Sequence, residues 1–237
     1  PTLPQPDPLP FCSAIEAAIT ETFAECDASI NEWNPNSEVS RLNSAALGDA
    51  VALNQPLDEV LRISDEAHRA TDGRFDPTVG ALTAAWRDSL DGGEMLSDER
   101  VEVLRSRTGW HQLGFAPGSG TVTKSGAGVA LDLGGVAKGW VVDALVARLT
   151  GLGLRDLLCE WGGDIKAAGS HRGREKPWRV AIYEPPSLAA LRGRFYASQD
   201  EAAAGEEDQA PLLACLPLRP GRAIAVSGDS AQARKFG

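Results

Sequence analysis

The stretch that decides the fold of this chain is Leu131-Asp132-Leu133-Gly134-Gly135-Val136-Ala137-Lys138-Gly139-Trp140-Val141-Val142-Asp143. An apolar run of strand character ends in Asp132 and the double glycine Gly134-Gly135, and we expect a helix to follow with Lys138 near its start. Glycine lets the backbone approach a bound group closely, and the amides of a turn or a helix start attract anions. The stretch therefore indicates a loop that holds an anionic cofactor, often together with a metal ion.

Composition and charge define the class of protein around this loop. The chain has 237 residues, of which 43% are hydrophobic and 24% charged, so it has the composition of a globular protein with one large domain or two small ones. Its net charge of -10 argues against nonspecific binding of nucleic acid. The sequence has no run of about 18 apolar residues, so we expect no transmembrane segment in it.

The start of the chain and its cysteines carry less information. Residues 1–10 are rich in proline, and we interpret them as a linker or the edge of a longer polypeptide. They have neither an initial methionine nor a signal-peptide pattern, so either a leader has been removed or upstream protein is missing. Four scattered cysteines lack the spacing of zinc ligands, which favours small buried thiols over a zinc site.

Hydrophobic periodicity and turn residues predict a mixture of helices and strands. Helices are expected over about 11–30, 37–43, 57–71, 98–107 and 136–150 and around Trp86, and strands over about 156–161, 178–183 and 222–226. The runs 121–124 and 128–131 flank Ser125-Gly126-Ala127, a pattern that predicts a hairpin. Because strict βαβ alternation is missing, an α+β fold is favoured. Residues 187–212 are acidic, and we interpret them as a solvated loop insertion.

Three predicted strands end in the same pattern, in which glycine lies close to an aspartate. These ends are Asp132 with Gly134-Gly135, then Gly162-Gly163-Asp164, then Ser227-Gly228-Asp229. The simplest alternative is that each is a tight turn capped by its aspartate. Three such ends together, with Phe75-Asp76-Pro77-Thr78 added, favour a shared binding site.

Two further residues support a ligand site. A lysine near a helix start opposes the helix macrodipole unless an anion lies between them, so Lys138 points to a bound anion rather than to a solvated helix surface. Trp33 is either a core residue or, because it stands in an Asn/Pro-rich loop, an aromatic cover over a ligand. None of the three histidines lies near the glycine motifs in sequence, so none is assigned a catalytic role.

Four ordered motifs give the chain a resemblance to a known family. They are Ser37-Glu38-Val39-Ser40-Arg41-Leu42-Asn43, Gly73-Arg74-Phe75-Asp76-Pro77-Thr78-Val79-Gly80, Asp132-Leu133-Gly134-Gly135-Val136-Ala137-Lys138-Gly139-Trp140 and Glu160-Trp161-Gly162-Gly163-Asp164-Ile165. In order and spacing these motifs resemble the ApbE family, which are FAD:protein FMN transferases, over about Trp33 to Asp229. The resemblance implies an ApbE-like α+β fold, with antiparallel-rich sheets flanked by helices, as one domain over 11–237.

The resemblance also implies a reaction and its residues. The family splits the pyrophosphate of FAD, moves FMN onto a threonine or serine of an acceptor flavoprotein, releases AMP and requires magnesium (Mg2+). By position, Trp33 falls where the family stacks an aromatic ring on FAD, and Arg74, Phe75 and Asp76 fall on a turn that contacts FAD. Asp132 and Lys138 also fall on FAD-contacting positions. Gly135 falls where a backbone carbonyl ligates the metal.

Departures from the family pattern leave alternatives open. The family usually begins with a strand that touches flavin, and after a Ser-Gly-Asp it continues to a His-Ile-Ile-Asp-Pro segment and to the main magnesium ligands; none of these is found in this sequence. We therefore expect the C-terminal part of the domain to be missing. The alternatives are a noncatalytic flavin-nucleotide-binding remnant and an FAD pyrophosphate hydrolase. Family members are often lipoproteins at the outer side of the inner membrane, but the compartment of this chain is left open.

Overall fold

The computed structural model describes residues 8–171, 176–183 and 212–226. They belong to two compact units, of which the first ends at Leu152 and the second begins at Gly153. Each unit is described by itself.

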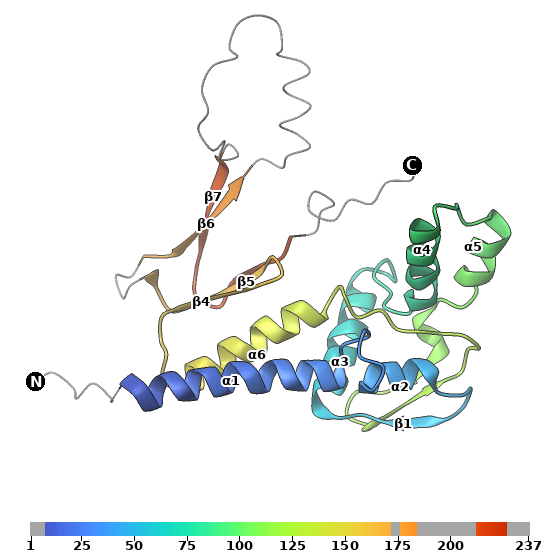
Figure 1. Cartoon of the computed structure of the whole chain (residues 1–237), viewed down its shortest axis with the longest axis horizontal. Helices are drawn as coiled ribbons and strands as arrows, with labels where there is room; N and C mark the ends of the chain where they lie inside the picture. Colours follow the sequence, from blue (N-terminus) through green and yellow to red (C-terminus); the bar gives the residue numbers. More distant parts are fainter. Residues whose placement is uncertain (1–7, 172–175, 184–211, 227–237) are drawn as a thin grey trace, which may run out of the picture. The chain divides into compact units, whose positions relative to one another are not determined.

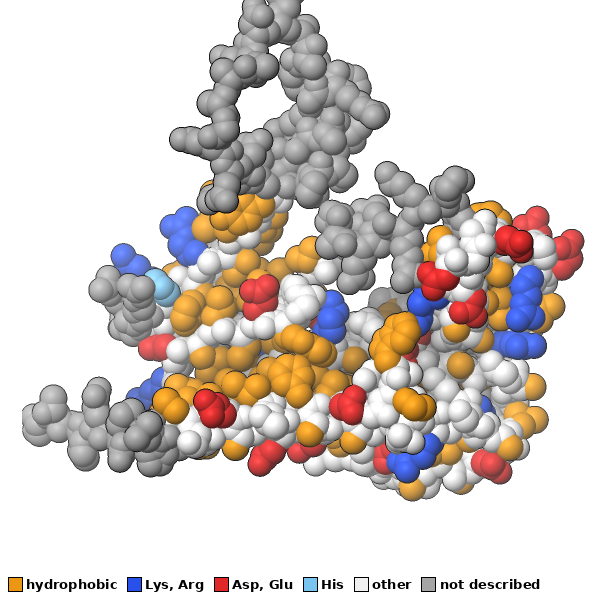
Figure 2. Space-filling model, viewed as in Figure 1, with side chains coloured by type: hydrophobic (Ala, Val, Ile, Leu, Met, Phe, Trp, Pro, Cys, Tyr) orange, Lys and Arg blue, Asp and Glu red, His pale blue; other side chains and the backbone are white. Residues whose placement is uncertain are grey.

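The first unit is mainly helical. Its helices are α1 (Pro8–Ser29), α2 (Glu38–Ser44), α3 (Gln55–Ala70), α4 (Gly80–Gly92), α5 (Asp98–Arg105) and α6 (Ala137–Gly151). Helices α1 and α6 lie side by side (Figure 1), and α1 also contacts α2 and α3. Figure 2 shows acidic and basic side chains gathered over the α4–α5 end of this unit. Among the described residues, no helix is long and apolar enough to cross a membrane.

Local sequence explains where α3 begins and ends. The side chain of Asn54 accepts a hydrogen bond from the Leu57 amide at 3.0 Å, which caps the first turn, and a proline stands within that turn. Its buried face carries Leu57, Val60, Leu61 and Ser64. Beyond the helix, Gly73 has φ of +75°, a backbone conformation that glycine adopts without strain. The predicted helix over 57–71 is therefore confirmed.

A small antiparallel sheet completes the first unit. It has the order β1-β3-β2, with β1 at Ala50–Ala52, β2 at Leu113–Phe115 and β3 at Thr121–Lys124. Val122 in the middle strand is opposite both Val51 and Phe115 and is fully buried. The sheet thus places β3 between β2, which directly precedes it in sequence, and β1, which comes from a distant part of the chain.

The predicted hairpin of 121–124 with 128–131 is wrong. The backbone of 130–132 pairs with other segments instead: Gly80 N donates to Ala130 O at 3.0 Å, and Asp132 N donates to Pro77 O at 2.8 Å. Ala130 also forms an isolated parallel bridge with Val79. Since β1 and β2 already occupy both edges of β3, the following segment is free to run to the start of α4.

The second unit consists of antiparallel strands. Strands β4 (Leu157–Trp161), β5 (Asp164–Ala168) and β8 (Ala223–Ile224) form one sheet in the order β4-β5-β8. Strands β6 (Trp178–Tyr183) and β7 (Leu212–Leu218) form a two-stranded ribbon. The strands predicted over 156–161 and 178–183 are confirmed, and 222–226 contains the shorter β8. Of the predicted acidic insertion, residues 187–211 lie outside the described part, and Leu212 begins β7.

The combination of helices with antiparallel strand pairs confirms the α+β prediction. The core of the first unit draws on α2, α3, α6, β3 and the segment before α6. Its fully or almost fully buried apolar residues include Val39, Leu42, Val60, Leu61, Val122, Leu131, Leu133 and Val141. Burying a side chain of this size stabilises a fold by about 1.5–3 kcal/mol. Leu131 and Leu133 therefore anchor the segment on both sides of Asp132.

Candidate functional site

Asn43 holds the backbone immediately before Asp132. The Leu131 amide donates to Asn43 Oδ1 at 2.7 Å, and Asn43 Nδ2 donates to the Leu131 carbonyl at 3.0 Å. One amide side chain thus satisfies both backbone groups of a buried residue 88 positions away in sequence. The last residue of the Ser37–Asn43 motif consequently fixes where Asp132 lies.

A buried lysine supports the same connection. Lys124 is only 6% exposed, and its Nζ donates to the Asn43 carbonyl at 2.8 Å. Burial lowers the pKa of the Lys124 amine, because removal from water disfavours its charged form. Lys124 thereby connects β3 to α2 at Asn43, the same residue that holds Leu131 before Asp132.

The double glycine forms a tight turn with exposed backbone. Gly134 N donates to Asp132 Oδ1 at 2.9 Å, and both Gly134 and Gly135 are exposed. A Cβ on Gly134 would lie 3.1 Å from Asp132 Oδ1, and a Cβ on Gly135 would lie 3.1 Å from Cε2 of Phe75. A side chain at either position would have to displace its neighbour by a few tenths of an ångström, so the close contacts favour glycine here. The structure also brings two predicted site residues, Phe75 and Gly135, into contact.

The turn that carries Arg74, Phe75 and Asp76 is held by hydrogen bonds on both sides of Phe75. His68 Nδ1 lies 2.8 Å from the Phe75 carbonyl oxygen, and the Phe75 amide donates to Thr71 Oγ1 at 3.0 Å. Arg74 is exposed. His68 therefore positions this turn, a role that the sequence reasoning missed; its only signal was a place in the last turn of α3, shortly before Gly73.

The Asp76 carboxylate binds to the protein itself. Its Oδ1 accepts from Thr78 N at 2.9 Å and from Thr78 Oγ1 at 2.5 Å, and its Oδ2 accepts from Trp110 N at 3.0 Å. Thr78 Oγ1 in turn accepts from Gly109 N at 2.7 Å. These bonds fold the turn back onto the start of α4, so in this structure Asp76 positions Phe75 and the backbone around it.

Trp33 stands in an ordered polar loop at the surface. Asp27 at the end of α1 accepts hydrogen bonds from Asn31 Nδ2 and Asn34 Nδ2, both at 2.8 Å, and the Trp33 amide donates to Asn31 Oδ1 at 3.1 Å. The Trp33 side chain is 71% exposed. The alternative of a core tryptophan is therefore excluded, and an aromatic surface is left open for contact.

Arg87 of α4 connects Trp33 to Asp132. Its guanidinium carbon lies 4.4 Å from the centroid of the Trp33 ring. Its Nη2 donates to Glu32 Oε1 at 3.1 Å and lies 3.8 Å from Asp132 Oδ2. Burial raises the pKa of Glu32, and the charge of Asp132 raises it further, whereas Arg87 and a backbone hydrogen bond with Leu133 lower it. Sequence reasoning missed both Glu32 and Arg87, because their link to Asp132 is visible only in three dimensions.

Lys138 is the second residue of α6 and is half-buried. The first turn of that helix has no acidic residue, so its positive end is not neutralised from within the turn. The turn carrying Gly135 directly precedes it. Together with the links through Arg87 and Phe75, the first unit places the predicted site residues Trp33, Phe75, Asp132 and Gly135 in one connected cluster.

The other two glycine-aspartate segments are not part of the described first unit: one lies in the second unit, and the other lies outside the described residues. Gly162 and Gly163, with φ of +58° and +89°, form the two-residue turn between β4 and β5, with Trp161 opposite Asp164. Ser227-Gly228-Asp229 lies outside the described residues. In the part of the chain that is described, no group of three His, Cys, Asp or Glu side chains is arranged to hold a metal ion.

Comparison with known proteins explains why these motifs occur together. The model of the ApbE family matches residues 3–235. The chain belongs to the ApbE family. A Chlamydia muridarum protein named FAD:protein FMN transferase is 34% identical over 181 residues, which cover 76% of this chain and 56% of the relative. A Rhodobacter capsulatus protein of the same name is 32% identical over 215 residues, which cover 90% of this chain and 36% of the relative.

Solved structures of ApbE proteins share the fold. The flavin transferase ApbE from Vibrio cholerae matches with a TM-score of 0.64 and 26% identity, covering 73% of this chain and 56% of that one. The ApbE protein from Thermotoga maritima matches with a TM-score of 0.73 and 23% identity over 91% of this chain and 62% of that one, and it bears on the fold alone. The predicted ApbE-like fold is confirmed. The chain spans about half the length of the Chlamydia relative.

Proposed function

We propose that this chain binds FAD and serves an FAD:protein FMN transferase. In the proposed reaction the FAD pyrophosphate is cleaved, FMN is attached through a phosphoester to a threonine or serine of an acceptor flavoprotein, and AMP is released. The observation that supports this proposal best is the cluster in which exposed Trp33 is linked through Arg87 to Asp132, beside the open double-glycine turn. It combines an aromatic surface, a carboxylate and exposed backbone, which suit an aromatic nucleotide ligand.

Each predicted residue has a distinct task in this proposal. The Trp33 indole stacks on the flavin ring, and Asp132 accepts a hydrogen bond from a polar edge of the ligand. Lys138, at the start of α6, opposes phosphate charge, and the helix start adds to the attraction. Arg74, Phe75 and Asp76 form the second side of the site, with Asp76 acting through the turn that it folds.

The described residues do not by themselves fit a magnesium ion. Gly135 offers one backbone carbonyl, whereas Mg2+ prefers about six oxygen ligands, several of them water or carboxylate. The described residues contain no group of three acidic, histidine or cysteine side chains that would complete the set. We propose the magnesium requirement from the resemblance to the family, with Gly135 as the ligand of this chain, and we derive no reaction step through the ion.

The proposal is tested by titrating the chain with FAD and by following the products. We expect wild-type protein to bind FAD, and Asp132→Asn to weaken binding about tenfold while the melting temperature stays unchanged. Incubation with FAD and magnesium, with and without an acceptor flavoprotein, then separates the alternatives. Flavin attached to the acceptor supports transfer, FMN and AMP formed without an acceptor indicate a hydrolase, and bound but intact FAD indicates a binding protein. Absence of FAD binding by the wild-type chain would overturn the proposal.

A further inference from the structure

We propose that Arg87 is a positioning residue, which fixes the Trp33 indole as a stacking platform and couples its orientation to the Asp132 carboxylate. The coupling between Trp33, Arg87 and Asp132 is a property of the protein without ligand. Only its expected effect on FAD binding rests on the proposed function. The resemblance assigned a role to Trp33 and to Asp132, but none to the arginine between them.

Arg87 supports one side of the tryptophan ring. A guanidinium 4.4 Å from the ring centroid makes a cation–π contact, and the planar group can lie against the ring while its N–H groups point outward in the plane. Because Trp33 is 71% exposed despite this contact, the indole keeps a large area on which an aromatic ligand can stack. The contact therefore orders the ring without covering it.

Arg87 also keeps two carboxylates together. Glu32 and Asp132 have side chains that are each 20% exposed, and the Arg87 guanidinium lies 3.1 Å from the first and 3.8 Å from the second. Two partly buried like charges repel each other unless a cation lies between them. Glu32 immediately precedes Trp33, so the same guanidinium that supports the ring also holds the backbone neighbour of that ring beside Asp132.

Helix α4 makes Arg87 a fixed support rather than a mobile surface arginine. The helix begins at Gly80, whose amide donates to the Ala130 carbonyl at 3.0 Å. A Cβ on Gly80 would lie 2.7 Å from that oxygen, so the helix start is in direct contact with the segment that leads to Asp132. Arg87 stands about two turns further along the same helix. The position of Asp132 relative to Arg87 is thus set by the backbone.

The coupling is tested first in the protein without ligand. Tryptophans are replaced by 5-fluorotryptophan, and the Trp33 resonance is assigned in the fluorine NMR spectrum with Trp33→Phe. We expect Arg87→Gln to shift and narrow this resonance because the ring loses its support. Asp132→Asn should shift the same resonance, and should have no further effect when Arg87→Gln is already present. A Trp33 resonance that is unchanged in Arg87→Gln would overturn the inference.

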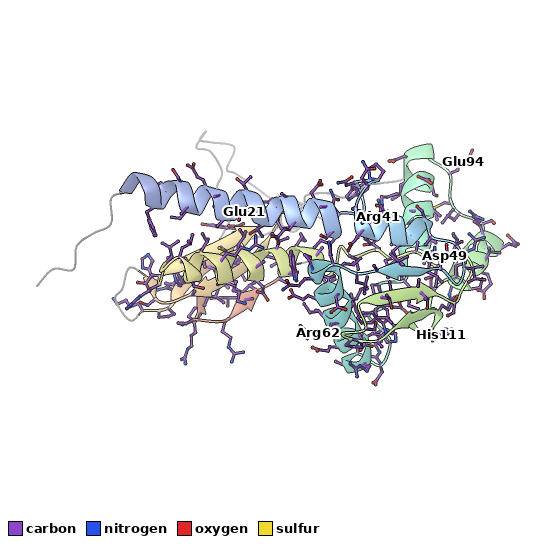
Figure 3. All side chains as sticks on the ribbon, turned by 90° about the horizontal axis from the view of Figure 1, so that it is seen from below. Glu21, Arg41, Asp49, Arg62, Glu94 and His111 are labelled. Atoms are coloured by element: carbon purple, nitrogen blue, oxygen red, sulfur yellow. The ribbon has the colours of Figure 1, made fainter. Side chains whose placement is uncertain are left out.

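Arginine is expected to be irreplaceable by lysine here. Arg87→Lys keeps the positive charge but loses the planar group, so it should leave the Trp33 ring as mobile as in Arg87→Gln. Arg62→Gln and Arg62→Lys are matched controls, since Arg62 pairs with Glu66 on the exposed face of α3 and is 45% exposed. Figure 3 shows Arg62 on α3, on the other side of the first unit from Glu94, which follows α4. Neither control should move the Trp33 resonance.

FAD titration then measures the consequence. We expect Arg87→Gln to weaken FAD binding about tenfold and Arg87→Lys about three- to tenfold, whereas both Arg62 variants bind like wild type. Wild-type affinity in Arg87→Gln, with Trp33→Ala still impaired, would overturn the inference and leave the proposed function standing. Wild-type protein that binds no FAD would refute the proposed function, while the fluorine spectra would still decide whether Arg87 orders the ring.

Discussion

Two turns in this molecule have a similar sequence, but glycine serves a different purpose in each. The turn after Asp132 and the turn before Asp164 each combine a double glycine with an aspartate. In the first, glycine is favoured because Asp132 Oδ1 and Phe75 Cε2 lie 3.1 Å from where a Cβ on Gly134 and on Gly135 would be. In the second, glycine is needed because φ is +58° and +89°, and a Cβ on Gly163 would meet nothing within 4 Å. Contacts with neighbouring side chains therefore characterise the turn after Asp132, whereas positive φ characterises the β4–β5 hairpin turn.

The two turns also differ in how they are attached to the rest of their units. The hairpin turn is closed locally, since Trp161 and Asp164 are paired across it. The turn after Asp132 depends on residues that are distant in sequence: Asn43 holds Leu131, Pro77 accepts from Asp132, and Arg87 lies beside the carboxylate. A turn fixed by remote side chains can be disrupted from a distance, and the predictions below use this difference.

The largest effect is expected from Asn43→Ala. It leaves the amide and the carbonyl of buried Leu131 without their partner, and unsatisfied buried groups cost about 1–3 kcal/mol each. We expect the free energy of unfolding, measured in urea, to fall by about 2–4 kcal/mol. Asn31→Ala, which removes two exposed hydrogen bonds, one to Asp27 and one from the Trp33 amide, is the control and should cost about 1 kcal/mol or less, because exposed groups bond to water instead. Equal losses in the two variants would contradict the role of Asn43.

Exchanging glycine for alanine should mainly affect FAD binding in the turn after Asp132 and mainly affect stability in the β4–β5 turn. In Gly135→Ala the new Cβ meets the Phe75 ring, so we expect weaker FAD binding and a small loss of stability. In Gly163→Ala the left-handed backbone strains alanine by about 1–2 kcal/mol, so we expect a lower free energy of unfolding and unchanged FAD affinity. FAD titration and urea unfolding of both variants measure the contrast. If Gly163→Ala weakened FAD binding as much as Gly135→Ala, the distinction between the turns would fail.

The sequence predicted the elements that are fixed by local patterns. The apolar periodicity of 57–71 suffices to place α3, although the helix begins two residues earlier, at Gln55 after the Asn54 cap. Asp132 with Gly134-Gly135 suffices to indicate a tight turn of exposed backbone. The wrong hairpin shows the limit: residues 128–131 have strand character, but their partners are Val79 and Gly80, which no local pattern reveals. Asn43, His68 and Arg87 were missed as site residues for the same reason. Each acts on a segment that only the folded chain brings to it.

Lys138 provides a smaller and more selective test. If it opposes phosphate charge at the start of α6, Lys138→Ala should weaken binding of FAD about three- to tenfold and leave riboflavin, which has no phosphate, bound as in wild type. Raising the salt concentration should reduce the difference, because a charge contact at a partly exposed residue is screened. Isothermal titration with both ligands measures it. Equal weakening of FAD and riboflavin would assign Lys138 to the shape of the turn rather than to phosphate.

The smallest effect concerns the support of α6 from α3. Trp140 Nε1 donates to Glu59 Oε2 at 2.8 Å, and Gln55 and Trp140 both hold the pKa of Glu59 below its usual value by donating to its charged form. A carboxylate with a lowered pKa stabilises the fold above its unfolded-state pKa and loses that contribution as the pH falls through the folded-state pKa. Glu59→Gln should therefore lower the melting temperature slightly near pH 7, and the difference from wild type should shrink toward zero in acid. Glu66→Gln, on the exposed side of α3, is the control and should change the melting temperature near pH 7 less than Glu59→Gln does. Helix α6 begins directly after the double-glycine turn. A loss of FAD affinity in Glu59→Gln would therefore show that this turn depends on the contact between α6 and α3. The β4–β5 turn, which is closed by its own strands, needs no such support.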